Sequence, residues 1–380
     1  MTRQTERIAL GGGRPGTERH IVIHRYGGRE ARPKAYLQAA LHADETPGLL
    51  VLHHLARVLD GAAERGEITG QIVLVPYANP IGLDQFVNRN HGGRFELAGG
   101  GNFNRNWPDL FEPVADRVAG RLSDDAAGNI ALIWDAVRDA VAERTAVTAL
   151  DALRLALVRE AADADIVLDL HCDDDALMHL YMIPALWPEA GDLAADLDCR
   201  AVLLADDAGG AAFDDTYSLL WTRLARRFPD HPIPAACLAA TVELRGRPDV
   251  SDALAGQDAL ALFRVLQRRG LVAGDPGPLP EMSCEATELS ACDVVRAPAA
   301  GVLSYAVDLG QQVGEGETVA WLIDPAAEDP AAGRREIKAR TDGLVLSRRV
   351  HKYVAAGMTV AKVVGTRPLP WRVAGQLMTD

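Results

Sequence analysis

Two side chains that could bind a metal ion, His42 and Glu45, lie three residues apart between Leu41 and Gly48. The apolar run 35–41 precedes them and predicts a strand, and Thr46-Pro47 directly after them is typical of a helix start. A catalytic zinc ion binds three protein ligands, commonly two histidines and a carboxylate, and keeps one position open for water. A four-residue pattern is common by chance, so the rest of such a site must be sought elsewhere in the chain.

The third ligand is expected at His171, which follows the apolar run 165–170 as His42 follows its own strand. In a parallel sheet both histidines would emerge at the carboxyl edge, where the active sites of α/β proteins form. Asp169, on the same side of that strand, could hydrogen-bond a metal-binding histidine. The alternative is that both histidines are structural residues whose hydrogen bonds are satisfied within the protein.

The pattern of hydrophobic residues predicts the elements that would position these groups. Strands are expected at 19–26, 34–42 and 71–77, with a helix at 48–60 capped by Thr46 between the last two. This order predicts a βαβ unit, and hence an α/β fold with a mixed, mostly parallel central sheet flanked by helices. Further strands are expected at 165–170, 180–183 and 239–244, and further helices within 114–162, 218–227 and 249–269.

A second domain is expected after the Gly/Pro-rich linker 274–280. Segments 296–322 and 338–363 resemble each other, and each predicts short strands around a glycine turn. They resemble the barrel-sandwich hybrid of lipoyl and biotinyl domains, but the turn 325–333 lacks the lysine that would carry such a cofactor. The chain is therefore divided into a catalytic domain, 1–273, and a small all-β domain, 281–380, for which a capping or packing role is expected.

Charge and composition exclude several classes of partner. The 380 residues contain 39 Lys and Arg against 53 Asp and Glu, a net charge of −14, which argues against nucleic acid or an anionic membrane as a partner. The five cysteines form no C-x-x-C pair and are expected to be reduced thiols. Neither a signal peptide nor a membrane-spanning run of apolar residues is recognised, so a cytoplasmic location is expected.

Several short motifs occur in a distinctive order across residues 35–270. They are His42-x-x-Glu45, Asn79-Pro80, Arg89, Asn104-Arg105-x-x-Pro108, Asp169-Leu-His171 and Val242-Glu243. In this order they resemble the succinylglutamate desuccinylase/aspartoacylase branch of the zinc carboxypeptidase superfamily, which also has a C-terminal β domain. The resemblance implies a zinc-carboxypeptidase-like fold and hydrolysis of an amide bond.

The resemblance implies one zinc ion per chain, bound by His42, Glu45 and His171. It implies that Asn104 and Arg105 hold the free carboxylate of a small-molecule substrate, a role that suits the planar fork of an arginine. An acidic protein could in this way bind an anionic substrate through a local arginine. Without the motif order, Arg105 would be read as a solvated loop charge.

The remaining implied roles concern the reaction itself. Arg89 would polarise the scissile carbonyl and stabilise the oxyanion, although a solvated loop charge is its alternative reading. Glu243 would act as general base toward a zinc-bound water and later deliver the proton to the leaving amine. A lone glutamate in an apolar strand is costly to bury unpaired, which independently favours a role for Glu243.

The sequence departs from the family pattern at two places. Ala43 replaces the usual glycine between the first two ligands, and Asn102-Phe103-Asn104-Arg105 replaces Asp-Leu-Asn-Arg. Neither change removes a group that the reaction needs, but the loop change leaves the substrate open. The acidic run 173–175 could favour a cationic substrate group or simply be solvated, and Cys172 is expected to be a packing residue.

The sequence therefore predicts a zinc-dependent deacylase that acts on an N-acylated amino acid or a similar small amide bearing a carboxylate. Two alternatives remain: a metallocarboxypeptidase acting on short peptides, and a non-catalytic carboxylate-binding protein on a hydrolase scaffold. The oligomeric state, including a homo-oligomer, is left open.

Overall fold

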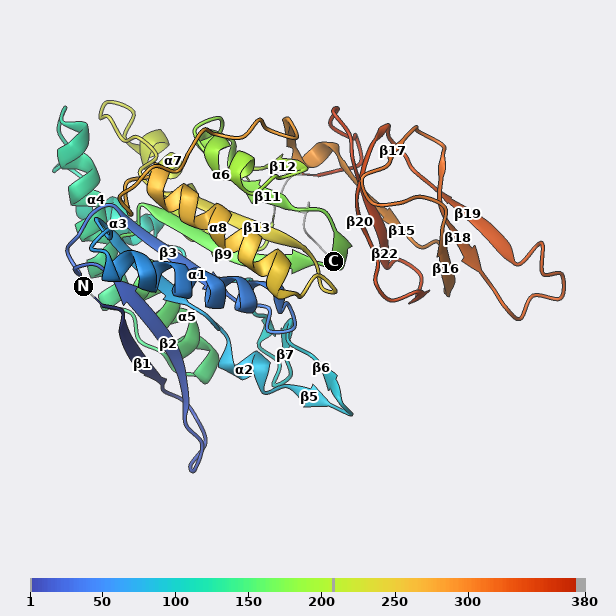
Figure 1. The fold of residues 1–380 in the computed structure, drawn as a ribbon, viewed down its shortest axis with the longest axis horizontal. Coiled ribbons are helices and arrows are strands. Elements are labelled where there is room, and N and C mark those ends of the chain that lie inside the picture. Colours follow the sequence, from blue (N-terminus) through green and yellow to red (C-terminus); the bar gives the residue numbers. More distant parts are fainter. Residues whose placement is uncertain (1, 207–208, 374–380) are drawn as a thin grey trace.

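A nine-stranded mixed sheet forms the centre of the protein (Figure 1). The structure, a computed structural model, describes residues 2–206 and 209–373. Strands β3, β4, β9 and β13 run parallel to one another, whereas β1, β2 and β11 introduce antiparallel pairs. The strands, in their order across the sheet, are β1 (Gln4–Leu10), β2 (Arg19–Tyr26), β4 (Gln71–Val75), β3 (Lys34–Ala39), β9 (Ile166–Asp173), β13 (Leu238–Gly246), β11 (His179–Met182), β12 (Ala201–Leu204) and β14 (Ala286–Glu288).

Helices cover both faces of this sheet. Because side chains alternate along a strand, Ala35, Leu37 and Ala39 of β3 enter one hydrophobic layer, while Tyr36 enters the opposite layer. Helices α1 (Pro47–Glu64), α6 (Gly191–Asp196) and α8 (Asp252–Arg268) pack on the first face, and α1 and α8 lie side by side in Figure 1. The second face is covered by α3 (Phe111–Val118), α4 (Ala126–Ala142), α5 (Ala149–Ala161) and α7 (Asp215–Arg227).

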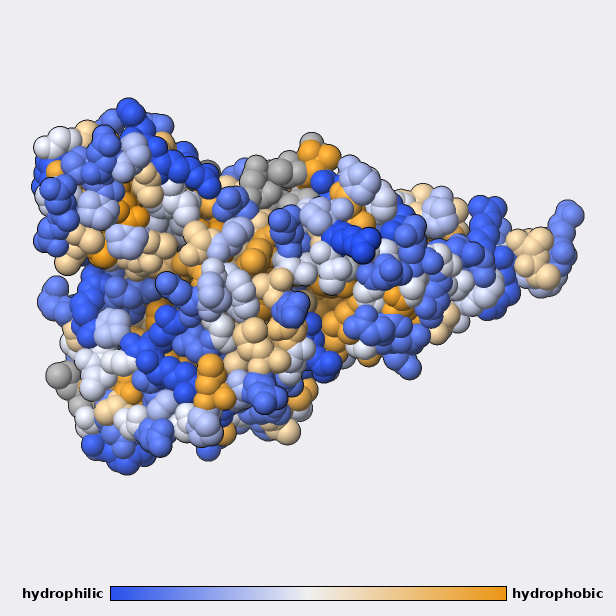
Figure 2. Space-filling model, turned by 90° about the horizontal axis from the view of Figure 1, so that it is seen from above, coloured by the Kyte–Doolittle hydropathy of each residue, from blue (hydrophilic) through white to orange (hydrophobic). Residues whose placement is uncertain are grey.

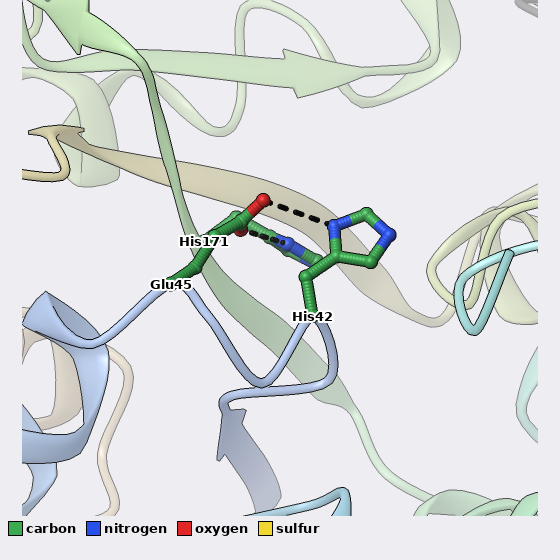
Figure 3. Close-up of side chains that lie close together, drawn as sticks. All are labelled: His42, Glu45 and His171. Carbon is green, nitrogen blue, oxygen red and sulfur yellow. Dashed lines mark hydrogen bonds and ion pairs between the residues drawn. The ribbon is translucent and has the colours of Figure 1, made fainter. Parts of the chain in front are cut away.

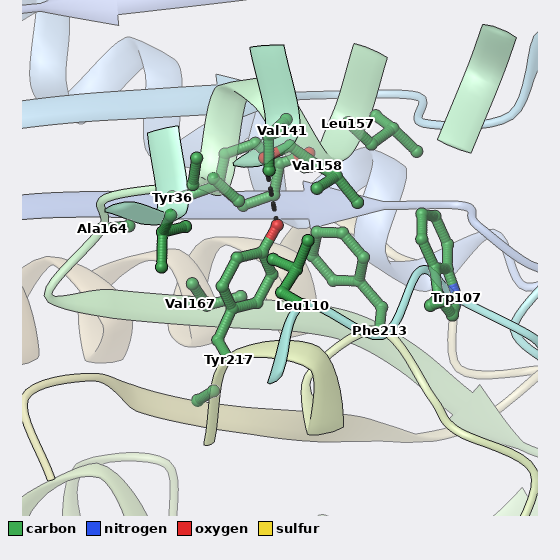
Figure 4. Close-up of a cluster of buried hydrophobic side chains, with 14 of the residues drawn as sticks. Tyr36, Trp107, Leu110, Val141, Leu157, Val158, Ala164, Val167, Phe213 and Tyr217 are labelled. Carbon is green, nitrogen blue, oxygen red and sulfur yellow. Dashed lines mark hydrogen bonds between the residues drawn. The ribbon is translucent and has the colours of Figure 1, made fainter. Parts of the chain in front are cut away.

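The layer beneath α4, α5 and α7 is rich in aromatic side chains (Figure 4). Phe213 packs against Tyr36, Trp107 and Tyr217, with ring centroids 4.7 to 5.8 Å apart. The Tyr217 hydroxyl donates to the Val158 carbonyl oxygen at 3.1 Å, so its polar atom is satisfied inside the core. This cluster ties the 104–107 loop and the start of α7 to the central sheet.

The predicted α/β fold with a mostly parallel central sheet is confirmed, with local differences at element ends. The strand predicted at 34–42 ends at Ala39, because Ala40 takes a left-handed φ of +56° and turns the chain. The helix predicted at 48–60 extends to Glu64, and the Thr46 side chain makes no capping hydrogen bond. Strands β1, β12 and β14 and helix α6 were not predicted.

The chain after Cys292 forms two further sheets. One has the order β10 (Asp175–Ala176), β20 (Gly343–Arg348), β22 (Thr359–Val364) and β15 (Cys292–Arg296), with β17 (Gln312–Val313) also paired to β20. The other has the order β19 (Arg334–Lys338), β18 (Thr318–Ile323), β16 (Gly301–Tyr305) and β21 (Tyr353–Val354). The predicted division into 1–273 and 281–380 stays a prediction, and each part lends one strand to the other, β10 in one direction and β14 in the other.

Ion pairs join the two parts at the acidic run 173–175. Lys362 Nζ of β22 lies 2.6 Å from Asp173 Oδ2, and both side chains are largely buried. The attraction between them holds the pKa of Asp173 below and that of Lys362 above its usual range, although burial opposes both ionised forms. The run is therefore paired rather than simply solvated; the other two pairs are Asp174–Arg349 (3.6 Å) and Asp175–Arg348 (3.0 Å).

The molecule is elongated, with a broad end built on the nine-stranded sheet and a narrow end formed by the C-terminal strands (Figure 2). Hydrophobic residues gather on the face shown near the middle, where the two parts meet. Within residues 2–206 and 209–373, no helix has the length and apolar character needed to cross a membrane.

Candidate metal centre

The turn after β3 and the neighbouring strand β9 bring His42, Glu45 and His171 to one point. After Ala40 the chain leaves β3, and a turn in which Glu45 N donates to His42 O (3.0 Å) places both side chains on the same side. Glu45 lies two residues before α1, which begins with Pro47. His171 lies on β9, the neighbour of β3 in the sheet. The predicted positions at the carboxyl edge therefore converge.

The nitrogen and oxygen atoms of these side chains face one another (Figure 3). His42 Nδ1 lies 3.1 Å from Glu45 Oε1, and His171 Nδ1 lies 2.8 Å from Glu45 Oε2. One ligand atom from each residue lies within 4.8 Å of the others, and all three side chains are buried. Two imidazoles and one carboxylate are the donor set that a catalytic zinc site uses.

The second nitrogen of each imidazole is held by an oxygen of the protein. His42 Nε2 donates to Asn102 Oδ1 at 2.8 Å, and His171 Nε2 donates to Asp169 Oδ2 at 2.9 Å. With the proton on Nε2, each neutral imidazole presents its Nδ1 lone pair toward Glu45. Two lone pairs and a carboxylate that converge in this way repel one another unless a cation lies among them, so these residues fit a bound metal ion.

The charge of Glu45 is stabilised despite its burial. Burial raises its pKa, but when His42 and His171 rather than a metal ion carry the positive charge they outweigh burial and hold the pKa of Glu45 well below its usual range. The backbone nitrogen of Cys172 also donates to Glu45 Oε2 at 3.2 Å. Burial raises the pKa of the Cys172 thiol, so this residue stays protonated and contributes its backbone rather than its sulfur.

Arg89, which the sequence predicted near the scissile carbonyl, lies away from this centre. It is exposed at the turn between the short strands β5 (Phe86–Val87) and β6 (Asn90–His91). Asn88 and Arg89 have φ values of +49° and +68°, as a two-residue hairpin of type I′ requires. Such a turn points its central side chains into solvent, and Arg89 does not line the cavity described below.

Arg94, which the sequence analysis did not single out, takes the place beside the ligands. Its Nη1 atom lies 3.2 Å from both His42 Nδ1 and Glu45 Oε1, so a cation already faces this donor set. One feature of the local sequence could have helped to choose between the two arginines. Asn88-Arg89-Asn90 is typical of a turn, which would have indicated that Arg89 lies at the tip of a hairpin.

Gly93 fixes the position of Arg94 against the ligand loop. Its carbonyl oxygen accepts from Ala43 N at 3.0 Å, and a Cβ on Gly93 would lie 2.2 Å from the Asp44 backbone nitrogen. Only glycine allows this close approach of two backbones. Ala43 itself is buried and is not among the residues with positive φ, so alanine at this position creates no backbone strain.

Asn104 and Arg105 both line the cavity next to the ligands. Asn104 Oδ1 accepts from Trp107 Nε1 (3.0 Å) and from Phe213 N (2.9 Å), and its Nδ2 lies 3.3 Å from His171 Nε2. The side chain of Arg105 is half-buried, and its stem packs so closely on Gly210 that a Cβ there would lie 2.3 Å from Arg105 Cδ. Their predicted role in binding a carboxylate stays a prediction.

Glu243 lies on β13, directly across from His171 of β9 in the sheet register. Its Oε2 atom is buried, and no described residue forms a hydrogen bond with it. Burial, together with the charge of Glu45, raises the pKa of Glu243 to about 8. A carboxyl group with an unused oxygen and a raised pKa beside a metal centre can accept and return a proton at neutral pH.

One cavity of about 710 Å³ is lined by His42, Glu45, Arg94, Asn104, Arg105, His171, Cys172 and Glu243. One side of the cavity is the edge of the central sheet, and the other is formed by residues of the C-terminal strands, among them Val294, Lys362 and Met358. The cavity is thus lined by both parts of the chain, and the capping or packing role expected for the β domain stays a prediction.

Comparison with known proteins adds a family to this geometry. The model of the succinylglutamate desuccinylase/aspartoacylase catalytic domain matches residues 31–267. A comparison with curated protein sequences found no match.

Solved structures share the whole architecture, including the C-terminal sheets. A succinylglutamate desuccinylase/aspartoacylase family protein from Shewanella amazonensis is 25% identical, with a TM-score of 0.84 over 95% of this chain and 98% of that chain. A similar protein from Shewanella frigidimarina is 23% identical, with a TM-score of 0.82 over 96% and 98% of the two chains. The ectoine utilization protein EutE (DoeB) from Ruegeria pomeroyi, in a product-bound structure, is 19% identical, with a TM-score of 0.67 over 96% and 95%.

Proposed function

The chain belongs to the succinylglutamate desuccinylase/aspartoacylase family, and from this membership we propose that it is a zinc-dependent amide hydrolase. Its substrate is an N-acylated amino acid or a similar small amide that bears a carboxylate. The products are the free acid of the acyl group and the free amine.

One observation carries this proposal: two imidazole Nδ1 atoms converge on the Glu45 carboxylate, and the unpaired Oε2 of Glu243 lies one strand away. His42, Glu45 and His171 would hold one zinc ion per chain. Zinc bound there supplies Lewis acidity, which polarises a carbonyl and makes a nearby water more acidic.

Glu243 is the general base in this proposal. Its carboxylate takes a proton from the attacking water and returns that proton to the leaving amine. Arg94, rather than Arg89, lies where a guanidinium can stabilise negative charge on the carbonyl oxygen, because it contacts both His42 and Glu45.

Arg105 binds the carboxylate of the substrate through its guanidinium. Asn104 positions this arginine, since Arg105 Nη1 donates to Asn104 O at 2.7 Å while the Asn104 amide is braced by Trp107 and Phe213. The recognised group is therefore a carboxylate close to the scissile amide.

The Glu243→Gln variant tests the proposal. Glutamine keeps the size of the side chain but cannot take up the proton, so kcat should fall by about 10²- to 10⁴-fold while about one zinc ion per chain is retained. Metal analysis and release of free amine from a panel of N-acetyl, N-succinyl and N-formyl amino acids provide the two measurements.

Glu143→Gln is the matched control, because the Glu143 side chain is 70% exposed and does not line the cavity. It should keep full activity. A Glu243→Gln variant as active as the parent would falsify the role of Glu243. Hydrolysis of short peptides but of no N-acyl amino acid would instead identify a carboxypeptidase.

A further inference from the structure

The cavity extends well beyond the metal centre along the edge of the central sheet. In the sheet register, Asp169 of β9 lies opposite Thr241 of β13, which lies opposite Tyr181 of β11, which in turn lies opposite Leu203 of β12. Neighbouring strands are about 4.8 Å apart, so Tyr181 lies about 10 Å and Leu203 about 14 Å from β9. The far part of the cavity is thus several bond lengths away from the ligands.

The opposite wall of this far part comes from β15 of the C-terminal sheets. Side chains alternate along a strand, and Cys292 and Val294 line the cavity. Asp293 and Val295 point the other way: Asp293 pairs with Arg340, and Val295 enters the hydrophobic core of the β domain. The face that β15 turns toward the cavity is therefore apolar at these two positions.

Four charged side chains of the chain after Cys292 line the cavity: Arg296, Arg349, Lys362 and Arg372. Arg349 pairs with Asp174 (3.6 Å), and Arg296 Nη1 donates to Gly357 O at 2.9 Å. Lys362 lies opposite Val294 in the β15–β22 register, but its ammonium is bound by Asp173 Oδ2 (2.6 Å) and lies 3.3 Å from the Tyr181 hydroxyl. It does not require an anionic group of the substrate. Tyr181, Leu203, Leu289, Cys292, Val294 and Met358 supply the apolar lining of this part.

The position of Glu243 indicates which half of the substrate reaches this compartment. Glu243 lies on β13, between the strands that carry the metal ligands and the strands β11 and β12 that carry Tyr181 and Leu203. In the proposed function, Glu243 delivers a proton to the leaving amine, so the amine lies on this side of the metal centre. The group attached to the amine then extends toward the apolar wall.

We propose that the amine component of the substrate is an amino acid with a long apolar side chain, which lies between Tyr181 and Leu203 on one side and Val294 on the other. This inference rests on the proposed function and narrows its substrate class. A cavity of about 710 Å³ is the size that holds drug-sized ligands, and an N-acetylated aspartate would leave most of it unfilled.

Kinetics of the zinc-loaded full-length protein test this inference. N-acetyl-L-methionine and N-acetyl-L-phenylalanine should be hydrolysed with a kcat/KM at least about tenfold above those of N-acetyl-L-aspartate and N-octanoyl-L-aspartate. Val294→Asp places a charge on the apolar wall and should lower kcat/KM for the methionine and phenylalanine substrates by about tenfold or more. The same variant should leave N-acetyl-L-alanine within about twofold, because its side chain is too short to reach the wall.

Val302→Asp is the matched control, since Val302 is 38% exposed on the C-terminal strand β16 and does not line the cavity. Val294→Thr keeps the shape of valine and serves as the second variant in case Val294→Asp does not fold. It should also lower kcat/KM for the methionine and phenylalanine substrates relative to N-acetyl-L-alanine. A preference for N-acetyl-L-aspartate would overturn the apolar subsite and leave the deacylase proposal standing. A preference for N-octanoyl-L-aspartate would overturn the assignment to the amine side, and no hydrolysis of any amide would overturn both proposals.

Discussion

At the scale of single residues, the two metal-facing imidazoles are oriented through the nitrogen that does not face Glu45. For His171 that nitrogen donates to Asp169, which also accepts from Gln38 Nε2 at 3.0 Å, so the chain of hydrogen bonds continues into the sheet. For His42 the acceptor is the amide of Asn102, where the family pattern has a carboxylate. A neutral amide supports the imidazole less strongly than a carboxylate would, so the two histidines are not held equivalently.

The two arginines of the 78–106 loop give a direct test at this scale. Arg94→Met removes the guanidinium that contacts His42 and Glu45, and kcat/KM should fall by about 10²- to 10³-fold. Arg89→Met changes an exposed hairpin tip and should stay within about twofold of the parent. Steady-state kinetics with matched zinc content provide the comparison, and equal losses in both variants would contradict the role of Arg94.

At the scale of elements, the start of α7 is held over the cavity by a buried carboxyl group. Asp214 precedes α7, is 6% exposed and accepts from Thr241 Oγ1 at 3.2 Å. Burial and the nearby charges of Asp215 and Asp169 raise its pKa to about 8. The folded protein therefore keeps Asp214 protonated at a pH where the unfolded chain has already released this proton.

This raised pKa predicts a dependence of stability on pH. The folded state binds the proton more tightly, so the contribution of Asp214 is fully present below about pH 4 and is lost as the pH rises toward 8. Asp214→Asn removes this loss. The difference in free energy of unfolding, variant minus parent, should therefore increase by up to about 1.4 kcal/mol for each pH unit between pH 5 and 7.5. Urea unfolding of the metal-free proteins measures the difference; a gap that does not change with pH would rule out the protonated state of Asp214.

At the scale of the whole molecule, the C-terminal strands are joined to the central sheet by a buried ion pair and by an exchange of strands. Lys362 and Asp173 line the cavity, so the contacts that join the C-terminal strands to the central sheet also shape the wall opposite Tyr181. Removing one charge of a buried pair leaves the other without compensation, which costs about 3–5 kcal/mol.

Lys362→Met should accordingly destabilise the protein by about 3 kcal/mol or more, because Asp173 stays buried without its partner. Lys338→Met is the control: its side chain is 51% exposed and pairs with exposed Glu336, so the change should be below about 1 kcal/mol. The double variant with Asp173→Asn should recover most of the loss. Thermal and urea unfolding provide the measurements, and a single variant as stable as the parent would show that the pair does not dock the domain.

Hydrophobic patterning was enough to predict the α/β class, because strands such as 19–26 and helices such as α8 bury a regular face whatever lies around them. The predicted ligands His42, Glu45 and His171 could be found for a related reason. His42 and Glu45 follow β3, and His171 lies near the end of β9. The end of an apolar strand can be read from the local sequence, and in a parallel sheet these ends meet at one edge.

What the sequence by itself determined is therefore the fold class, the family resemblance and the residues that converge at the candidate metal centre. Only the tertiary structure decided that Arg94 rather than Arg89 faces the candidate metal centre and that the acidic run 173–175 pairs with Lys362 and its neighbours. It also decided that Cys292 and Val294 of β15 line the cavity. The first outcome depends on a hairpin turn and on the close contact of two backbones, and the second on the Lys362–Asp173 pair, whose members are nearly two hundred residues apart. A local sequence pattern carries no information about contacts at that separation.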